Sequence, residues 1–210
     1  MFITLEGIDG SGKTTQIKYI VDFLQSIGKK CVATREPGGT TIGEKIRAIL
    51  LTQSSEDLDY MAELLLFTAD RCQHIKIKII PAINDGKFVI CDRYFDATLA
   101  YQGYARGIDK KLIEKLHSLI NKNLKPDLTF LFDIPEKLGL ARALKQINKG
   151  AKTKYETKFE HEKIEFHKKV RAGYLKIAKK KPETFYIVDA SKDILSVRQE
   201  IIMFLKKRLN

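Results

Sequence analysis

The residues with the clearest chemical pattern lie near the start of the chain, where Gly7–Thr14 reads GIDGSGKT. This segment fits G-x-x-x-x-G-K-[ST] at every fixed position, between a short apolar run and an amphipathic one. Glycines let backbone N–H groups approach a phosphate, and a following helix adds free N–H groups and its positive dipole end. Lys13 can reach the β- and γ-phosphates, and the Thr14 hydroxyl can ligate a bridging Mg²⁺. The pattern predicts a nucleotide-phosphate site formed by Gly7, Ile8, Asp9, Gly10, Ser11, Gly12, Lys13, Thr14 and Thr15.

The elements around this loop alternate between two periodicities. Strand-like apolar runs occur at 2–5, 30–34, 88–92, 128–133 and 185–188, and helical patterns at 13–27, 42–51, 60–84, 109–122, 135–146, 159–181 and 194–209, with a further helical stretch after 94. Such alternation predicts an α/β fold: an open five-stranded parallel sheet with helices on both faces, of the P-loop NTPase type. We expect one domain over 1–210, with ligands at the carboxyl ends of the strands. The segment at about 146–158 is rich in lysine and has no apolar stripe, which indicates a mobile lid loop.

Composition limits the compartment and the partners. No run of eighteen apolar residues and no signal-peptide pattern is visible, so we expect neither a membrane span nor export. Three widely spaced cysteines form neither a disulfide framework nor a zinc pattern, and Cys31 and Cys91 are expected to be buried in strands; both points favour the cytoplasm. The net charge of +12 comes from scattered lysines without interleaved aromatic residues, so we expect no nucleic-acid partner.

The arginines favour phosphoryl transfer over hydrolysis. Four arginines fall in segments expected at the carboxyl edge of the sheet, namely Arg35, Arg71, Arg93 and Arg106. A planar guanidinium suits the phosphate of a second substrate, whose approach to the first is opposed by charge repulsion. A GTPase is excluded because the segment at 121–124, NKNL, lacks the aspartate of the guanine signature.

Further motifs make the sequence similar to the bacterial thymidylate kinase family over nearly its whole length. They are the acidic third position of the loop (Asp9), TREPGGT at 34–40, LLFTADR at 65–71, DRY at 92–94, AYQG at 100–103, RG at 106–107, KPDL at 125–128, RAGYL at 171–175 and DAS at 189–191. The resemblance implies Mg²⁺-dependent transfer of the γ-phosphoryl group of ATP to dTMP, and a homodimer. Two other functions stay open: a kinase for another pyrimidine nucleoside monophosphate, and a P-loop regulatory module that only binds nucleotide.

The resemblance also implies roles for individual residues. Phe67 would stack on thymine and Arg71 would bond a base carbonyl, and their spacing of four places both on one side of a helix. Asp9 would accept from the sugar 3′-hydroxyl, and Tyr101 would fill the space that a 2′-hydroxyl needs. Arg35 and Arg93 would hold the acceptor phosphate, with Lys13, Arg93 and Asp9 as catalytic residues. The implied substrate-binding set is Asp9, Arg35, Glu36, Pro37, Phe67, Arg71, Arg93, Thr98, Tyr101 and Gln102.

On the donor side, the resemblance implies that Arg142 and the turn at 189–191 flank adenine, and that Asp92 orients Mg²⁺ together with Thr14. The chain departs from the family in its lid, because no arginine occurs between 143 and 170 and Lys158 stands where an arginine is usual. Lys158 is therefore the leading candidate for the cation that stabilises the transferred phosphoryl group. Taken alone, these residues have ordinary alternatives: core packing for Phe67 and Tyr101, ion pairs for Arg35 and Arg93, a strand-end cap for Asp92, and solvated loop lysines.

Overall fold

Five short parallel strands form the centre of the molecule. They are β1 (Phe2–Glu6), β2 (Cys31–Arg35), β3 (Phe88–Asp92), β4 (Leu128–Asp133) and β5 (Phe185–Asp189), and they pair in the order β2-β3-β1-β4-β5. This arrangement comes from a computed structural model that describes residues 1–52, 57–148 and 157–209. The sheet confirms the predicted α/β fold. The phosphate-binding loop follows its central strand, β1.

Each strand ends in a charged residue, and the pairing brings these ends to one edge. Leu5 lies opposite Asp92 on β3, Arg35 is also paired with Asp92, and Asp133 is paired with Asp189. Because all strands run the same way, five charged positions share the carboxyl edge of a sheet whose other strand residues are uncharged. That edge is where the sequence predicts the site.

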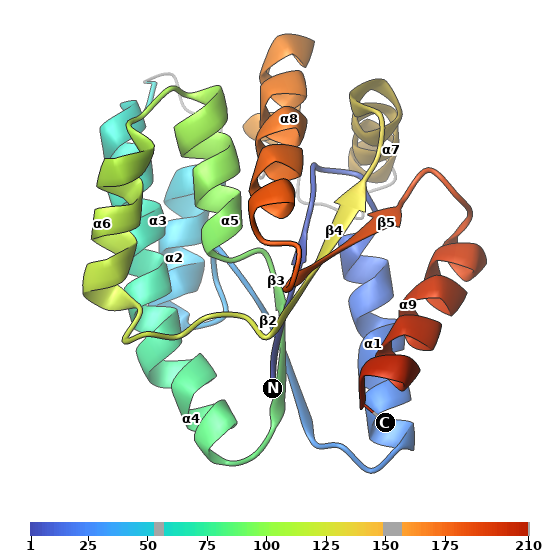
Figure 1. Cartoon of the computed structure of the whole chain (residues 1–210). Coiled ribbons are helices and arrows are strands. Elements are labelled where there is room, and N and C mark those ends of the chain that lie inside the picture. The colour runs from blue at the N-terminus through green and yellow to red at the C-terminus, as the bar shows by residue number, and fades with distance from the viewer. Residues whose placement is uncertain (53–56, 149–156, 210) are drawn as a thin grey trace.

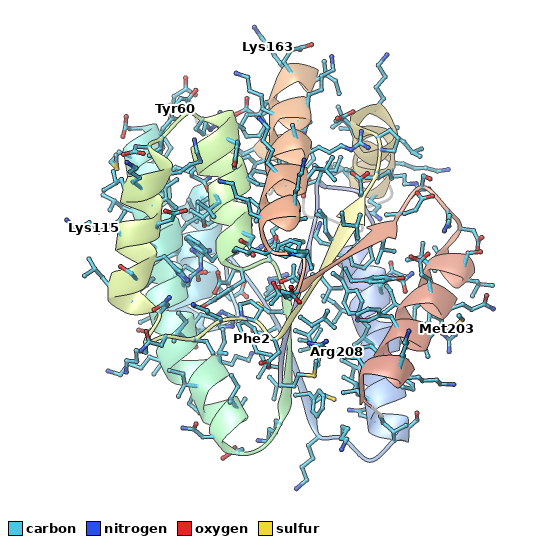
Figure 2. All side chains as sticks on the ribbon, viewed as in Figure 1. Phe2, Tyr60, Lys115, Lys163, Met203 and Arg208 are labelled. Atoms are coloured by element: carbon cyan, nitrogen blue, oxygen red, sulfur yellow. The ribbon has the colours of Figure 1, made fainter. Side chains whose placement is uncertain are left out.

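The helices cover both faces of the sheet, as Figure 1 shows. On one face α1 (Lys13–Ser26) lies beside α9 (Ile194–Leu209). The other face carries α2 (Thr41–Leu51), α3 (Tyr60–His74), α4 (Ile80–Asn84), α5 (Phe95–Thr98) and α6 (Lys110–Ile120). Near the carboxyl ends of the strands lie α7 (Glu136–Asn148) and α8 (Ile164–Lys180). Side chains fill the layers between them, with Phe2 in the centre and Lys115 and Lys163 on the outside (Figure 2).

Two segments differ from the helices expected from periodicity. The helix predicted over 60–84 contains a π-helical turn, η1 (Ile75–Ile79), just before Pro81, which has no N–H to donate to the carbonyl four residues earlier. The helix predicted from 159 begins only at Ile164, after a 3₁₀ turn at Phe159–His161 in which the Phe159 side chain is buried. A second π-helical segment, η2 (Leu99–Ala105), follows α5 and carries residues of the site.

Three further predictions concern the cysteines, the membrane and the lid. Cys91 is buried as expected, whereas Cys31 on the edge strand is only partly buried. Among the described residues, no helix combines the length and apolarity needed to cross a bilayer. The central part of the predicted lid loop, 149–156, lies outside the described residues.

Candidate active site

The phosphate-binding loop is a tight turn between β1 and α1. Gly10 has a φ of +73°, and a side chain there would collide with the carbonyl oxygen of Gly139 in α7, so the position requires glycine. Gly12, also left-handed with a φ of +91°, precedes α1, and no side chain caps the first turn of that helix. The N–H groups of this turn are therefore available to an anion.

Lys13 lies buried beneath the loop it belongs to. Its Nζ donates to the carbonyl oxygens of Gly7 and Ile8, at 3.0 Å each, and to Ser11 Oγ at 3.3 Å. Burial, followed by the nearby charge of Arg93, lowers the pKa of Lys13 to about 8. A bound polyphosphate would offer this ammonium charged acceptors in place of neutral ones and so stabilise its protonated form.

Thr14 and Asp92 form a small oxygen site beside the loop. The Thr14 hydroxyl donates to Asp92 Oδ2 at 3.1 Å, while Asp92 Oδ1 is buried and has no hydrogen-bond partner in the described part of the chain. An unpaired buried carboxylate oxygen next to a hydroxyl fits a hydrated Mg²⁺. No group of three or more carboxylates, histidines or cysteines within the described ranges could hold a metal, so phosphate and water oxygens would complete the shell.

Arg93 joins the phosphate loop to the neighbouring cavity. This residue, directly after β3, has an unusual φ of +65°. Its Nη1 donates to the Gly7 carbonyl at 2.8 Å and to Tyr174 Oη at 3.1 Å, and its Nη2 pairs with Asp9 Oδ1 at 2.8 Å. The Tyr101 hydroxyl donates to the other oxygen of Asp9 at 3.0 Å. The structure thus brings together Asp9, Arg93 and Tyr101, three residues that the sequence singled out.

A buried carboxyl group supports Arg93 from behind. Glu6 accepts hydrogen bonds from the Tyr94 N–H and the Tyr174 hydroxyl, at 2.8 Å each. Burial, with the nearby carboxylate of Asp96, raises the pKa of Glu6 to about 8. Because Tyr94 is the residue after Arg93 and Tyr174 contacts its guanidinium, Glu6 fixes both the backbone and the side chain of Arg93.

Arg71 is held in a second buried network on the other side of the cavity. Its Nε donates to Glu36 Oε2 at 2.7 Å, and its Nη2 donates to Thr98 Oγ1 at 2.9 Å. His74 Nδ1 lies 2.9 Å from the other oxygen of Glu36, and its Nε2 lies 2.6 Å from Thr34 Oγ1. The guanidinium is consequently presented in one orientation, as planar recognition of a ligand carbonyl requires.

A cavity lies between these two networks. The Glu36–Pro37 peptide bond beside it is cis, and η2 supplies Tyr101 and Gln102 to its wall. Apolar and aromatic side chains with a few convergent polar groups are typical of a small-molecule site. The cavity is lined by Asp9, Glu36, Pro37, Arg47, Leu51, Phe67, Arg71, Arg93, Tyr94, Ala97, Thr98, Tyr101, Gln102, Phe159 and Glu160.

The residues predicted to flank adenine also lie together. Arg142 in α7 donates from Nη1 to the Ala190 carbonyl at 2.7 Å and from Nη2 to the Ser191 carbonyl at 3.1 Å. The same turn is closed by Asp189, which accepts from the N–H of Ser191. The guanidinium and the turn after β5 therefore form one rigid unit near the carboxyl edge of the sheet.

Two predicted residues are engaged elsewhere. Arg35 pairs with Glu44 at 3.0 Å, is half-exposed and does not line the cavity, whereas Arg47 of α2 does. Lys158 Nζ donates to the buried Glu63 at 2.8 Å and does not line the cavity either. In this conformation neither side chain is placed with the phosphate loop.

Sequence reasoning missed several residues of the site. Arg47 had a usable signal, because it follows Gly43 by four and precedes Leu50 by three, and both neighbours are on the buried face of α2. Phe159 had none, since its ring reaches the cavity only because the chain turns before α8. Glu63 contacts partners 39, 43 and 95 positions away, which no local pattern indicates.

Comparisons with known proteins agree with this geometry. A family model described as Thymidylate kinase matches residues 5–201. The chain is 52% identical over 209 residues to a thymidylate kinase from Desulforapulum autotrophicum, covering 100% of this chain and 92% of that protein. It is 47% identical over 207 residues to one from Desulfosudis oleivorans, with 99% and 97% covered.

A solved structure is similar over the same extent. The crystal structure of thymidylate kinase from Ehrlichia chaffeensis superposes with a TM-score of 0.76 at 38% identity, covering 98% of each chain. The family match and the full-length relatives decide between the three functions that the sequence left open. This chain belongs to the thymidylate kinase family and phosphorylates dTMP to dTDP.

Proposed function

We propose that the site transfers the γ-phosphoryl group of Mg²⁺-ATP to dTMP across the contact between Arg93 and the phosphate loop. The observation that carries this proposal is the 2.8 Å bond from Arg93 Nη1 to the Gly7 carbonyl. A guanidinium that is hydrogen-bonded to the phosphate-binding loop and also lines the cavity can hold the donor and acceptor phosphates close together and offset their repulsion. Lys13 binds the donor phosphates, and Arg93 binds the acceptor phosphate.

The cavity holds the thymidine part of dTMP in this proposal. Phe67 stacks on the base, and Arg71, oriented by Glu36 and Thr98, bonds a base carbonyl. Asp9 accepts from the 3′-hydroxyl. Tyr101, fixed on Asp9 at 3.0 Å, occupies the space of a 2′-hydroxyl, so ribonucleotides are excluded by contact.

On the donor side, Arg142 and the turn at 189–191 flank adenine, and the buried Asp92 oxygen with Thr14 holds Mg²⁺ through oxygen and water ligands. The ion, when bound, neutralises phosphate charge. Arg35 as a phosphate ligand and Lys158 as the lid cation stay predictions, and each would have to leave its carboxylate partner. We also infer a single kinase domain that works in the cytoplasm.

The experiment compares ADP release with dTMP, dUMP, UMP, CMP and no acceptor, each with and without Mg²⁺. We expect turnover to need dTMP and Mg²⁺, and UMP to be a poor acceptor. Arg93→Lys keeps the charge but not the fork, so it should raise the KM for dTMP more than the KM for ATP. Equal turnover with UMP and dTMP would contradict the role of Tyr101, and equal effects of Arg93→Lys on both KM values would contradict that of Arg93.

Exposed apolar side chains on α2 and α3 support a homodimer. Ile42 and Ile49 of α2, and Met61 and Leu65 of α3, are large apolar side chains with 39% to 59% of their area exposed. An apolar face on two adjacent helices suits an isologous contact. Sedimentation of the protein and of Leu65→Glu tests this: the variant should be a monomer, and a wild-type monomer would refute it.

A further inference from the structure

We propose that Glu63 sets the choice of base, because its carboxylate fixes the orientation of the Gln102 side-chain amide in the cavity. Glu63 itself does not line the cavity. It is a positioning residue that acts through Gln102. The inference rests on the proposed placement of the thymine base beside Phe67 and Arg71.

Glu63 is a buried carboxylate with a donor on each oxygen. No part of its side chain is exposed. Its Oε2 accepts from Lys158 Nζ at 2.8 Å, and its Oε1 accepts from Gln102 Nε2 at 2.8 Å and from Arg106 Nε at 3.5 Å. A carboxylate that pairs with the cations Lys158 and Arg106 can only accept hydrogen bonds.

The carboxylate of Glu63 determines which way the Gln102 amide points. A carboxylate cannot donate, so the NH₂ group of Gln102 must face Glu63 and the carbonyl oxygen must face away from it. Gln102 lines the cavity, and within the described residues its Oε1 accepts no hydrogen bond. The cavity that Phe67 and Arg71 also line therefore carries an acceptor that is free for a ligand.

An acceptor at this position distinguishes pyrimidines by their N3 atom. Thymine and uracil carry a hydrogen on N3 and can donate to Gln102, whereas cytosine has a lone pair there that would face the carbonyl oxygen. A site built to bond one polar group rejects an analogue that leaves the group unpaired. Glu63 thus contributes discrimination against cytosine and none between thymine and uracil.

The test measures the dissociation constants of dTMP, dCMP and dUMP for the full-length protein and for Glu63→Gln. The glutamine has nearly the same shape but can donate, so the Gln102 amide is free to turn over. We expect the ratio of the dCMP to the dTMP constant to fall at least fivefold, with the ratio of dUMP to dTMP unchanged. An unchanged dCMP ratio in a folded variant would overturn the inference.

Two further variants separate this effect from general damage. Glu162→Gln is the matched control, because Glu162 also binds Arg106, at 2.6 Å, but does not touch Gln102; its ratios should equal those of the wild type. Should Glu63→Gln fail to fold, Glu63→Asp keeps the charge for Lys158 and withdraws the carboxylate from Gln102. The dCMP ratio should fall there too, and an unchanged ratio would again refute the inference.

The swap Glu63→Gln with Gln102→Glu gives an independent check. It leaves one carboxylate in the pair and again places an acceptor in the cavity, so the preference for dTMP over dCMP should return. Absence of that rescue would count against the inference. A wild-type protein that binds dCMP as well as dTMP would instead refute the proposed base site itself, which keeps the two failures distinct.

Discussion

Removing the hydroxyl of Tyr174 should weaken the hold on the acceptor phosphate without disturbing the base site. Arg93 donates to three groups: the Gly7 carbonyl, Asp9 and the Tyr174 hydroxyl. The ring of Tyr174 is 1% exposed and would remain in Tyr174→Phe, so packing is preserved. The substitution removes one of the three hydrogen-bond acceptors of the guanidinium and one of the two hydrogen-bond donors to Glu6.

The magnitude follows from these contacts. Loss of a buried hydrogen bond that involves a charged group costs about 1.5–3 kcal/mol of stability. Arg93 keeps two of its three acceptors, so we expect about 1 kcal/mol of that loss to appear in dTMP binding, which is about fivefold in the dissociation constant. Glu6 loses one partner, and the remaining loss should appear as a lower urea midpoint of unfolding.

Calorimetric titration with dTMP and with thymidine tests the reasoning. Thymidine has the same base and sugar but no phosphate, so its affinity should be unchanged in Tyr174→Phe while that of dTMP falls. Tyr186→Phe is the matched control, because the Tyr186 hydroxyl contacts only Glu200, at 3.4 Å, among the described residues. An equal loss for both ligands would show that Tyr174 merely supports the cavity, and no loss for dTMP would refute its link to Arg93.

Three other substitutions give separate predictions. Glu36→Gln leaves Arg71 buried without its carboxylate, so unfolding in urea should show a loss of about 3–5 kcal/mol, accompanied by a higher KM for dTMP. Lys158→Ala should lower kcat if Lys158 leaves Glu63 to stabilise the transferred phosphoryl group; unchanged turnover would refute that role. Burial, with the charges of Arg71 and Lys181, lowers the pKa of His117 to about 3. Below pH 6.5 the unfolded chain therefore binds a proton at His117 that the folded chain does not bind. The free energy of unfolding should fall by about 2 kcal/mol between neutral pH and pH 5, and His117→Gln should lack this loss.

The strands and the phosphate loop could be predicted because local pattern determines them. The runs at 88–92 and 128–133 are mostly apolar segments that end in aspartate, and the structure has β3 and β4 with the same limits. A parallel strand buried on both faces has little choice of composition. The position of Arg93 followed from the same fact, since it comes directly after such a strand.

The helices were less predictable where backbone hydrogen bonding changes. The helical periodicity of 3.6 residues continues through 75–79, yet the chain forms a π-helical turn there. Pro81 has no N–H, so the regular series of backbone hydrogen bonds changes before it. The segment η2 contains no proline, so no residue of the sequence marks its change of hydrogen bonding. That segment carries Tyr101 and Gln102, so part of the site depends on a feature without a local signature.

The charges explain why Arg35 and Lys158 differ from expectation. The sequence predicts that a cation lies near the edge of the sheet, but it does not predict which carboxylate the cation pairs with. Here the partners are a carboxylate at a helix terminus for Arg35 and a buried carboxylate for Lys158. Glu44 stands in the first turn of α2 and accepts from Arg35 and from the Gly39 N–H. An exposed pair of this kind is worth little, so a bound phosphate could displace it.

Glu63 differs from Glu44 because it is fully buried. Taking Lys158 away would leave its Oε2 without that partner, at a cost that an exposed pair does not carry. The two predicted phosphate ligands thus face unequal barriers: Arg35 is held by a weak surface pair, whereas Lys158 must leave a buried acceptor that also fixes Gln102. Recruitment of Lys158 by ATP would therefore require Arg106 and Gln102 to keep their hydrogen bonds to Glu63. This requirement couples the lid cation to the base site.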